Sequence, residues 1–250
     1  RPTHPSDLSR RQFLGHSARN AAGAAAGMVA LSSTPAVADQ ADPVQVGIIG
    51  VRNQGRNLAE RLARISGAEI AALCDVDSSL ESAARKAVGE HQESAPLWHE
   101  DFRRVLDDAS IDAVVIATPD HWHAIMGVLA CQAGKDVYLE KPVSHTVEEG
   151  QRLVEAARKH DCVMQTGLQQ RSGSHFQSAI ETVRSGKLGT VKFARAWIAN
   201  ARRPMKPKKD ESAPAGVNYD LWLGPAPERA FNANRFHHHW RSFQDYGTGE

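Results

Sequence analysis

The sequence has almost no net charge and few cysteines. Over 250 residues, 30 basic and 29 acidic side chains leave a formal net charge of +1, so no overall field attracts nucleic acid or an anionic membrane. The short basic stretch at 202–210 is broken by proline, and we interpret it as a solvated loop. Cys74, Cys131 and Cys162 show no C-x-x-C spacing, so they indicate neither a disulfide framework nor a zinc site. Each lies in an apolar run and is expected to be a small buried hydrophobic residue.

The sequence also has no N-terminal apolar run long enough to cross a bilayer. The stretch AAGAAAGMVAL at 21–31 is too short for a stable transmembrane helix. Paired arginines at 10–11 precede it, and the small-x-small sequence AVA at 36–38 follows it. These are the three parts of an export signal of the twin-arginine (Tat) type. We therefore predict that residues 1–38 are a signal peptide, that the Tat machinery is a partner, and that a periplasmic protein begins near Asp39.

From residue 44 to residue 167, short apolar strands alternate with amphipathic helices. This alternation predicts an α/β fold with a Rossmann-like, doubly wound, mostly parallel sheet. The predicted strands are 44–50, 69–77, 111–119, 135–142 and 162–167, and the predicted helices are 53–66, 78–90, 99–108, 121–134 and 146–160.

The pattern changes after Gly167. A helix is predicted over about 174–185, and an imperfectly alternating strand over 191–200. We place a nucleotide-binding domain at 39–167 and the start of a second domain at 168–250. Because the sequence begins with Arg rather than Met and stops within DYGTGE, we expect a fragment whose second domain is incomplete.

A glycine-rich turn, GVRNQG, follows the first predicted strand and opens the first helix. Its residues are Gly50, Val51, Arg52, Asn53, Gln54 and Gly55. In the dinucleotide fingerprint G-x-G-x-x-G, the glycines allow a tight turn, close approach of the pyrophosphate and close helix packing. Arg52 replaces the middle glycine, but the strand-turn-helix context still predicts a phosphate site at the helix N-terminus. An ordinary glycine-rich turn is the alternative.

The next predicted strand ends in acidic residues. Asp75 lies about 20 residues after Gly55, where an acid is expected to bind the ribose hydroxyls of a dinucleotide. A carboxylate there repels a 2′-phosphate, so the expected cofactor is NAD rather than NADP. Asp77 is an alternative for this role, and both acids are also typical helix N-caps.

Two later predicted strands end in the motifs ATPDHWH (117–123) and LEKP (139–142). Ligands bind beyond the carboxyl ends of strands in a doubly wound sheet, so Glu140 and Lys141 are expected to face the nicotinamide. A lysine there can hydrogen-bond a substrate hydroxyl and stabilise the developing alkoxide. Pro142 fixes the backbone and is compatible with a cis bond. A surface Glu-Lys pair is the alternative interpretation.

In this order, VGIIGVRNQG, CDVD, ATPDHWH, EKP and QTGLQQRS resemble the Gfo/Idh/MocA oxidoreductase family, and the resemblance extends over 44–250. YDLWLGPAPERAF and RFHHHWRSFQDYGTGE are similar to its Tat-exported bacterial branch. The resemblance implies that Lys141 is catalytic and touches the nicotinamide. It also implies that the cofactor contacts include Thr118, Pro119, His121 and His123.

The same resemblance implies a second domain with a large, open, mostly antiparallel sheet. That domain forms the substrate site and often an oligomer interface, so we expect a homo-oligomer for the whole protein. The family's catalytic histidine follows the region that matches YGTGE, beyond residue 250. The chain as given is therefore expected to bind the cofactor at best weakly and to lack turnover.

The predicted function is an oxidoreductase that takes hydride from a CH–OH group of a sugar, cyclitol or related polyol, with Lys141 polarising the oxygen. Candidate substrate contacts, for which packing under a loop is the alternative, are Arg171, Trp240, Arg241 and Tyr246. No metal site is predicted, because neighbouring side chains of the triple histidine 237–239 point in different directions. We place those histidines in a loop or the substrate cleft.

Export adds a constraint, because free NAD is expected to be scarce outside the cytoplasm. We therefore expect a tightly held nucleotide that is loaded before export. One alternative is a redox-neutral, NAD-dependent glycosidase of the same fold. Relatives of that kind lack the lysine of EKP, so Lys141 favours the oxidoreductase. The other alternative is a non-catalytic exported protein that binds a sugar or nucleotide.

Overall fold

A computed structural model describes residues 42–197 and 205–249, and the predicted signal peptide lies outside this range. The described residues form six strands: β1 (Val44–Ile49), β2 (Ala68–Cys74), β3 (Leu97–His99), β4 (Ala113–Ile116), β5 (Asp136–Glu140) and β6 (Met164–Gly167). The α-helices are α2 (Asn53–Ala63), α3 (Glu81–Gly89), α4 (Phe102–Asp107), α5 (Asp120–Gln132), α6 (Val147–Lys159), α7 (Ser174–Arg184) and α8 (Tyr219–Leu223). Three 3₁₀ turns are η2 (Ser78–Leu80), η3 (Gln169–Ser172) and η4 (His237–Ser242).

The six strands form one parallel sheet in the order β3-β2-β1-β4-β5-β6. The chain moves outward in one direction from β1 to β3 and then crosses back to β4 on the other side of β1. Such an order confirms the predicted doubly wound α/β class, and it creates a switch point between β1 and β4. A ligand is expected beyond the carboxyl ends of these two strands.

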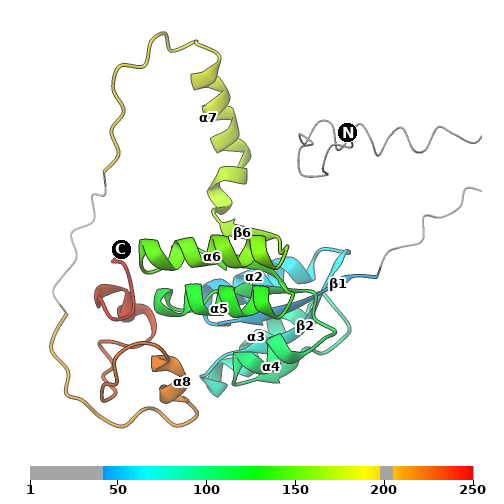
Figure 1. Ribbon diagram of the computed structural model, residues 1–250, viewed down its shortest axis with the longest axis vertical. Helices are drawn as coiled ribbons and strands as arrows, with labels where there is room; N and C mark the ends of the chain where they lie inside the picture. The colour runs from blue at the N-terminus through cyan, green and yellow to red at the C-terminus, as the bar shows by residue number, and fades with distance from the viewer. Residues whose placement is uncertain (1–41, 198–204, 250) are drawn as a thin grey trace, which may run out of the picture. The chain divides into compact units, whose positions relative to one another are not determined.

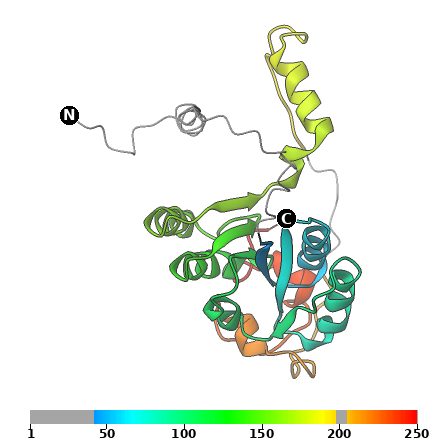
Figure 2. The ribbon, with the colours of Figure 1, turned by 90° about the vertical axis from the view of Figure 1, so that its right-hand side faces the viewer.

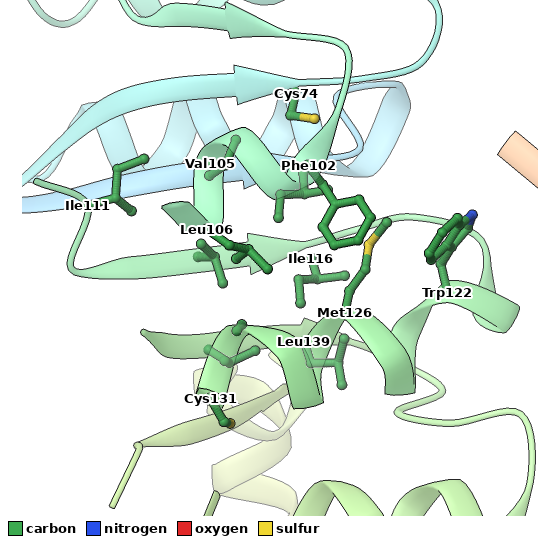
Figure 3. Packing of buried hydrophobic residues seen from close by; sticks show 14 of the residues in the cluster. Cys74, Phe102, Val105, Leu106, Ile111, Ile116, Trp122, Met126, Cys131 and Leu139 are labelled. Carbon is green, nitrogen blue, oxygen red and sulfur yellow. The ribbon is translucent and has the colours of Figure 1, made fainter. Parts of the chain in front are cut away.

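Helices cover both faces of the sheet (Figures 1 and 2). Side chains alternate along a strand, so one strand serves two cores. In β4, Val114 and Ile116 pack with residues of α4, α5 and α6, whereas Val115 packs with residues of α2 and α3. Figure 3 shows the first of these cores. There the ring of Phe102 in α4 packs edge to face against that of Trp122 in α5, with the ring centroids 5.4 Å apart.

Helix α6 begins where the sequence predicts it. The hydroxyl of Thr146 accepts the backbone N–H of Glu149, and the Glu149 carboxylate accepts the backbone N–H of Thr146. This capping box satisfies two of the donors that a helix N-terminus leaves unpaired. Strand β3 was missed by the sequence patterns, because three residues are too few for a period to be recognised.

The segment after the sheet differs from its prediction. Residues 191–197 form no strand, and 198–204 lie outside the described range. Lys192 and Arg195 interrupt both faces of the sequence pattern, and no described residue pairs with this stretch, although a strand needs a hydrogen-bonded neighbour. The large antiparallel sheet is therefore not formed by the described residues. Nor does this part of the chain contain a helix of sufficient length and apolarity to cross a membrane.

The last described segment packs on the carboxyl-end side of the sheet. Its buried, mainly aromatic hydrophobic cluster consists of Trp222, Leu223, Phe231, Phe236, Trp240 and Tyr246. The indole N–H of Trp122 in α5 donates to the carbonyl of Trp222 at 3.1 Å. The backbone and hydroxyl of Thr248 donate to Asp120, at 3.1 and 3.2 Å. These contacts bring the segment to the end of the sheet where ligands bind in this fold class.

Candidate functional site

The glycine-rich turn has the backbone that a dinucleotide needs. Gly50 has a φ of +85°, a conformation that favours glycine. At Gly55 a Cβ would lie 1.7 Å from the carbonyl oxygen of Gly50, so only glycine lets helix α2 approach β1 this closely. The helix begins at Asn53, and its first amides and its positive dipole end are oriented toward the switch point. Arg52 is exposed, and Val51 is buried.

Asp75 supports this turn from the end of β2. Its carboxylate accepts the backbone N–H of Val51 at 2.9 Å and that of Asp77 at 3.1 Å. Burial, the largest influence, raises the pKa of Asp75 to about 6. The predicted ribose ligand is therefore also the residue that fixes the glycine-rich turn to the second strand.

Asp77 is almost fully buried and caps η2, as the capping alternative anticipated. One carboxylate oxygen accepts the backbone N–H of Ser79 at 3.1 Å and its hydroxyl at 2.5 Å. The other oxygen lies 3.3 Å from Nε2 of His237. Both acids line the same pocket, and the contact with His237 brings a residue of the last segment to the nucleotide side.

The motif after β4 contributes a polar atom without a partner. Among the described residues, the buried hydroxyl oxygen of Thr118 has no hydrogen-bond partner, and Thr118 and Pro119 line the pocket. A buried polar group without a partner is rare. A ligand hydroxyl or amide would satisfy this one.

His121 and His123 stand behind the pocket rather than in its lining. The ring of His123, which is 1% exposed, lies between the carbonyls of Thr118 at 2.9 Å and Pro142 at 2.5 Å. It thereby connects the motif after β4 with the motif after β5. His121 contacts the carbonyl of Trp222 at 3.1 Å, and burial lowers the pKa of its imidazole.

The EKP motif contains a buried acidic residue, Glu140, and an exposed basic residue, Lys141. Glu140 is 5% exposed and accepts the side-chain amide of Gln54 at 2.8 Å and that of Gln169. Lys141 is exposed at the carboxyl end of β5, and the Lys141–Pro142 bond is cis, as the sequence allowed. Glu140 therefore ties the glycine-rich turn to the strand that carries Lys141. Neither residue lines the pocket.

The pocket has an empty volume of about 960 Å³, part of which is open to solvent. One side consists of the glycine-rich turn, the acids after β2 and the Thr-Pro pair after β4. The other side comes from the last segment and includes Trp222, Phe236, His237, His238, Trp240 and Arg241. Sequence reasoning placed the histidines in a loop or the substrate cleft but did not foresee this closure. The dense aromatic and histidine content of 236–241 was its only local sign.

The four candidate substrate contacts separate in the structure. Trp240 and Arg241 line the pocket, with the Arg241 guanidinium 4.3 Å from the centre of the Trp240 ring. Tyr246 is wholly buried, and its ring packs against that of Trp222 with centroids 4.8 Å apart. Tyr246 therefore has the packing role that was the alternative to substrate contact. Arg171 is exposed in η3 and does not line this pocket.

Comparison with protein families matches both parts of the chain. Residues 44–168 match the NAD-binding Rossmann fold of the Gfo/Idh/MocA oxidoreductases, and residues 184–250 match the family's C-terminal α/β domain. The chain belongs to the Gfo/Idh/MocA oxidoreductase family. An NAD-binding Rossmann fold is thus confirmed at the level of the family, and so is the presence of sequence from its C-terminal α/β domain.

Individual relatives point to two chemistries. Glycosyl hydrolase family 109 protein 2 of Shewanella sp. (strain ANA-3) is 32% identical over 222 residues, which are 80% of this chain and 48% of the relative. Myo-inositol 2-dehydrogenase of Lactobacillus plantarum has a TM-score of 0.55 at 26% identity, over 60% of this chain and 43% of the other. Scyllo-inositol dehydrogenase of Lactobacillus casei, solved with bound NAD(H) and scyllo-inositol, has a TM-score of 0.54 at 28% identity, over 59% of this chain and 43% of the other.

The chain thus spans about half the length of the curated relatives it matches. The comparisons establish an NAD-binding enzyme family in which dehydrogenases and family 109 glycosyl hydrolases both occur. The residues of the Gfo/Idh/MocA chain fit NAD. They offer a tight glycine turn, helix amides for the pyrophosphate, acids at the end of β2 and the unpartnered hydroxyl of Thr118.

Proposed function

We propose that this chain carries the cofactor-binding part of an NAD-dependent oxidoreductase acting on a CH–OH group of a sugar, cyclitol or related polyol. The observation that supports this most is the position of Lys141. It is exposed at the carboxyl end of β5, two strands from β1 in the sheet and on the side where the switch point lies. A cation there can serve the reacting oxygen of a polyol.

The roles of the chain's residues follow from their contacts. When bound, NAD supplies the nicotinamide that accepts the hydride. The amides of α2 and Arg52 hold the pyrophosphate, and the acids after β2 hold the adenosine ribose. Lys141 would donate a hydrogen bond to the substrate oxygen and stabilise its developing negative charge while a separate general base takes the hydroxyl proton. Glu140 acts through Gln54 and keeps the turn and the lysine-bearing strand in register.

A second candidate is a redox-neutral glycosidase, which the family 109 relatives favour. In that chemistry a sugar hydroxyl would be oxidised by the bound nucleotide, the glycosidic leaving group would be eliminated, water would add to the resulting double bond, and the hydride would return to the carbonyl. Both candidates use the same cofactor pocket and begin with the same hydride transfer. They differ in whether a glycosidic bond is broken, so a leaving group released from an aryl glycoside distinguishes them.

We also propose that the protein is exported by the Tat route with its nucleotide already bound, as a homo-oligomer. The basis for export is the sequence of residues 1–38, and the basis for a retained nucleotide is a pocket that is lined by two separate parts of the chain. The homo-oligomer is proposed from the resemblance to the family. Sequencing the N-terminus of the exported protein is expected to find a start near Asp39. A start before the arginine pair at 10–11 would refute the export signal.

The oxidoreductase is tested with the whole protein purified without added nucleotide. Denaturation is expected to release NAD, and extensive dialysis of the native protein is expected to leave it bound. A panel of polyols is then expected to reduce the nicotinamide, while aryl glycosides release no leaving group. Glycoside release without net reduction would establish the glycosidase. Absence of nucleotide and of hydride transfer would establish a binding protein.

A further inference from the structure

His237 occupies an unusual position at the start of η4. Its backbone has a φ of +47°, which non-glycine residues rarely adopt. Its ring packs on Phe236 with centroids 3.8 Å apart, and its Nε2 atom lies 3.3 Å from the Asp77 carboxylate. An unfavourable backbone conformation persists where surrounding contacts determine it, and such residues gather at binding sites.

The two residues are held together by the backbone as well as by their side chains. The backbone N–H of Asn218 donates to the carbonyl of Val76 at 2.8 Å, and that of Ser78 donates to the carbonyl of Gly216 at 2.9 Å. Asp77 and Val217 form the antiparallel bridge between them. The last segment is thus hydrogen-bonded directly to the stretch that carries Asp77, although 160 positions separate Asp77 from His237 in the sequence.

The charges around the pair define what it can recognise. Burial and the nearby Arg52 guanidinium lower the pKa of His237 to about 4, so the imidazole is neutral at pH 7. A neutral imidazole has one donor and one acceptor. Next to a carboxylate, the favourable tautomer carries its proton on Nε2, which lies 3.3 Å from Oδ2 of Asp77 and is within reach of a hydrogen bond to it. Oδ1 of Asp77 already accepts two hydrogen bonds from Ser79, so the acceptor left for a hydroxyl is the second lone pair of Oδ2, the oxygen that faces His237.

We propose that His237 is a positioning residue of the nucleotide site: it orients the Asp77 carboxylate toward the adenosine ribose hydroxyls and so favours NAD over NADP. This inference rests on the proposed function. A 2′-phosphate would meet a carboxylate and an uncharged imidazole, and Arg52 would compensate only part of that repulsion. In this arrangement Asp75 fixes the glycine-rich turn, and Asp77 binds the ribose.

The test measures the dissociation constants of NAD and NADP by calorimetry on the whole chain freed of nucleotide. His237→Asn tolerates the positive φ but is too short to reach Asp77. It is expected to weaken NAD about tenfold, as expected for a lost hydrogen bond to a charged group, and to change NADP much less. His237→Gln keeps a donor and is expected to recover part of the loss. The matched control is His239→Ala, an exposed neighbour outside the pocket lining, which is expected to bind like wild type.

A double-mutant cycle with Asp77→Asn separates positioning from general stability. If His237 acts through Asp77, adding His237→Asn to Asp77→Asn is expected to change NAD affinity little further. Full additivity of the two losses, or an unchanged NAD to NADP ratio in His237→Asn, would overturn the proposal. Should His237→Asn fail to fold, His237→Gln and Asp77→Asn complete the same cycle. If wild type binds NAD and the His237 variants bind it equally well, this inference alone is overturned. If wild type binds neither NAD nor NADP, the proposed function is overturned as well.

Discussion

Gly55→Ala is expected to damage both the fold and the cofactor site. A Cβ at Gly55 would lie 1.7 Å from the carbonyl oxygen of Gly50, which is 1.3 Å below the 3.0 Å limit that real Cβ contacts essentially never cross. It would also lie 2.9 Å from the carbonyl carbon. Both atoms are backbone, so no change of rotamer removes the clash. The first turn of α2 must instead move away from β1.

The magnitude follows from overpacking of a close contact, which costs about 1–3 kcal/mol. For a chain of this size, that loss lowers the melting temperature by about 2–12 °C. The shift of α2 also displaces the amides at Asn53 that are proposed to hold the pyrophosphate, so NAD affinity is expected to fall.

Gly89→Ala is the matched control. It introduces the same methyl group in the last residue of α3, where a Cβ meets nothing within 4 Å. Because glycine is the poorer helix former, this change is expected to stabilise the protein by up to about 1 kcal/mol. Thermal melts followed by circular dichroism, with NAD titrations by calorimetry, compare the two variants. A Gly55→Ala protein that melts and binds NAD like wild type would refute the reasoning.

Three further substitutions separate the other roles. The pKa of Asp75 is about 6 in the folded protein and about 3.9 in the unfolded chain, so its contribution to stability is greatest below about pH 4 and is lost as the pH rises through about 6. Thermal melts of Asp75→Asn over this pH range should not show that loss. A dependence of melting temperature on pH identical to that of wild type would contradict the assignment. Glu140→Ala removes the buried carboxylate that accepts the side-chain amides of Gln54 and Gln169. Because both glutamines are exposed and can hydrogen-bond water instead, the loss should be about 0.5–1.5 kcal/mol in denaturant titrations, with weaker NAD binding, and an unchanged midpoint would show that this contact contributes little. Lys141→Ala should preserve stability to within about 0.5 kcal/mol but reduce turnover of the whole protein at least about 100-fold, whereas activity close to wild type in steady-state assays would remove Lys141 from the chemistry.

The sequence predicted the features of the fold that depend on local patterns. Gly50 and Gly55 stand in a short turn between a strand and a helix, so their spacing alone indicated a tight approach. The carboxyl ends of β2, β4 and β5 carry the polar motifs, and parallel topology brings these ends to one edge of the sheet. The pocket lining by Asp75, Asp77, Thr118 and Pro119 was therefore predictable from their places after a strand end, whereas Glu140 and Lys141 lie outside that lining.

The closure of the pocket by the last segment depends on distant contacts, and no local pattern encodes it. His237 reaches Asp77 through the backbone bridge at Val217 and the aromatic packing around Trp222. The burial of His123 between two loop carbonyls likewise follows from two strand ends coming together. In both cases the side chain gains its role from a partner that is distant in sequence, so residue type and spacing were insufficient.

The most direct test of the central claim is a single-turnover experiment on the whole protein, purified with no nucleotide added. Polyols are titrated into the protein while the absorbance of reduced nicotinamide is followed. The account predicts a rise that is stoichiometric with the protein for at least one sugar or cyclitol, and its loss in Lys141→Ala. A protein that contains no nucleotide, or one that holds NAD but only releases leaving groups from glycosides, would contradict it.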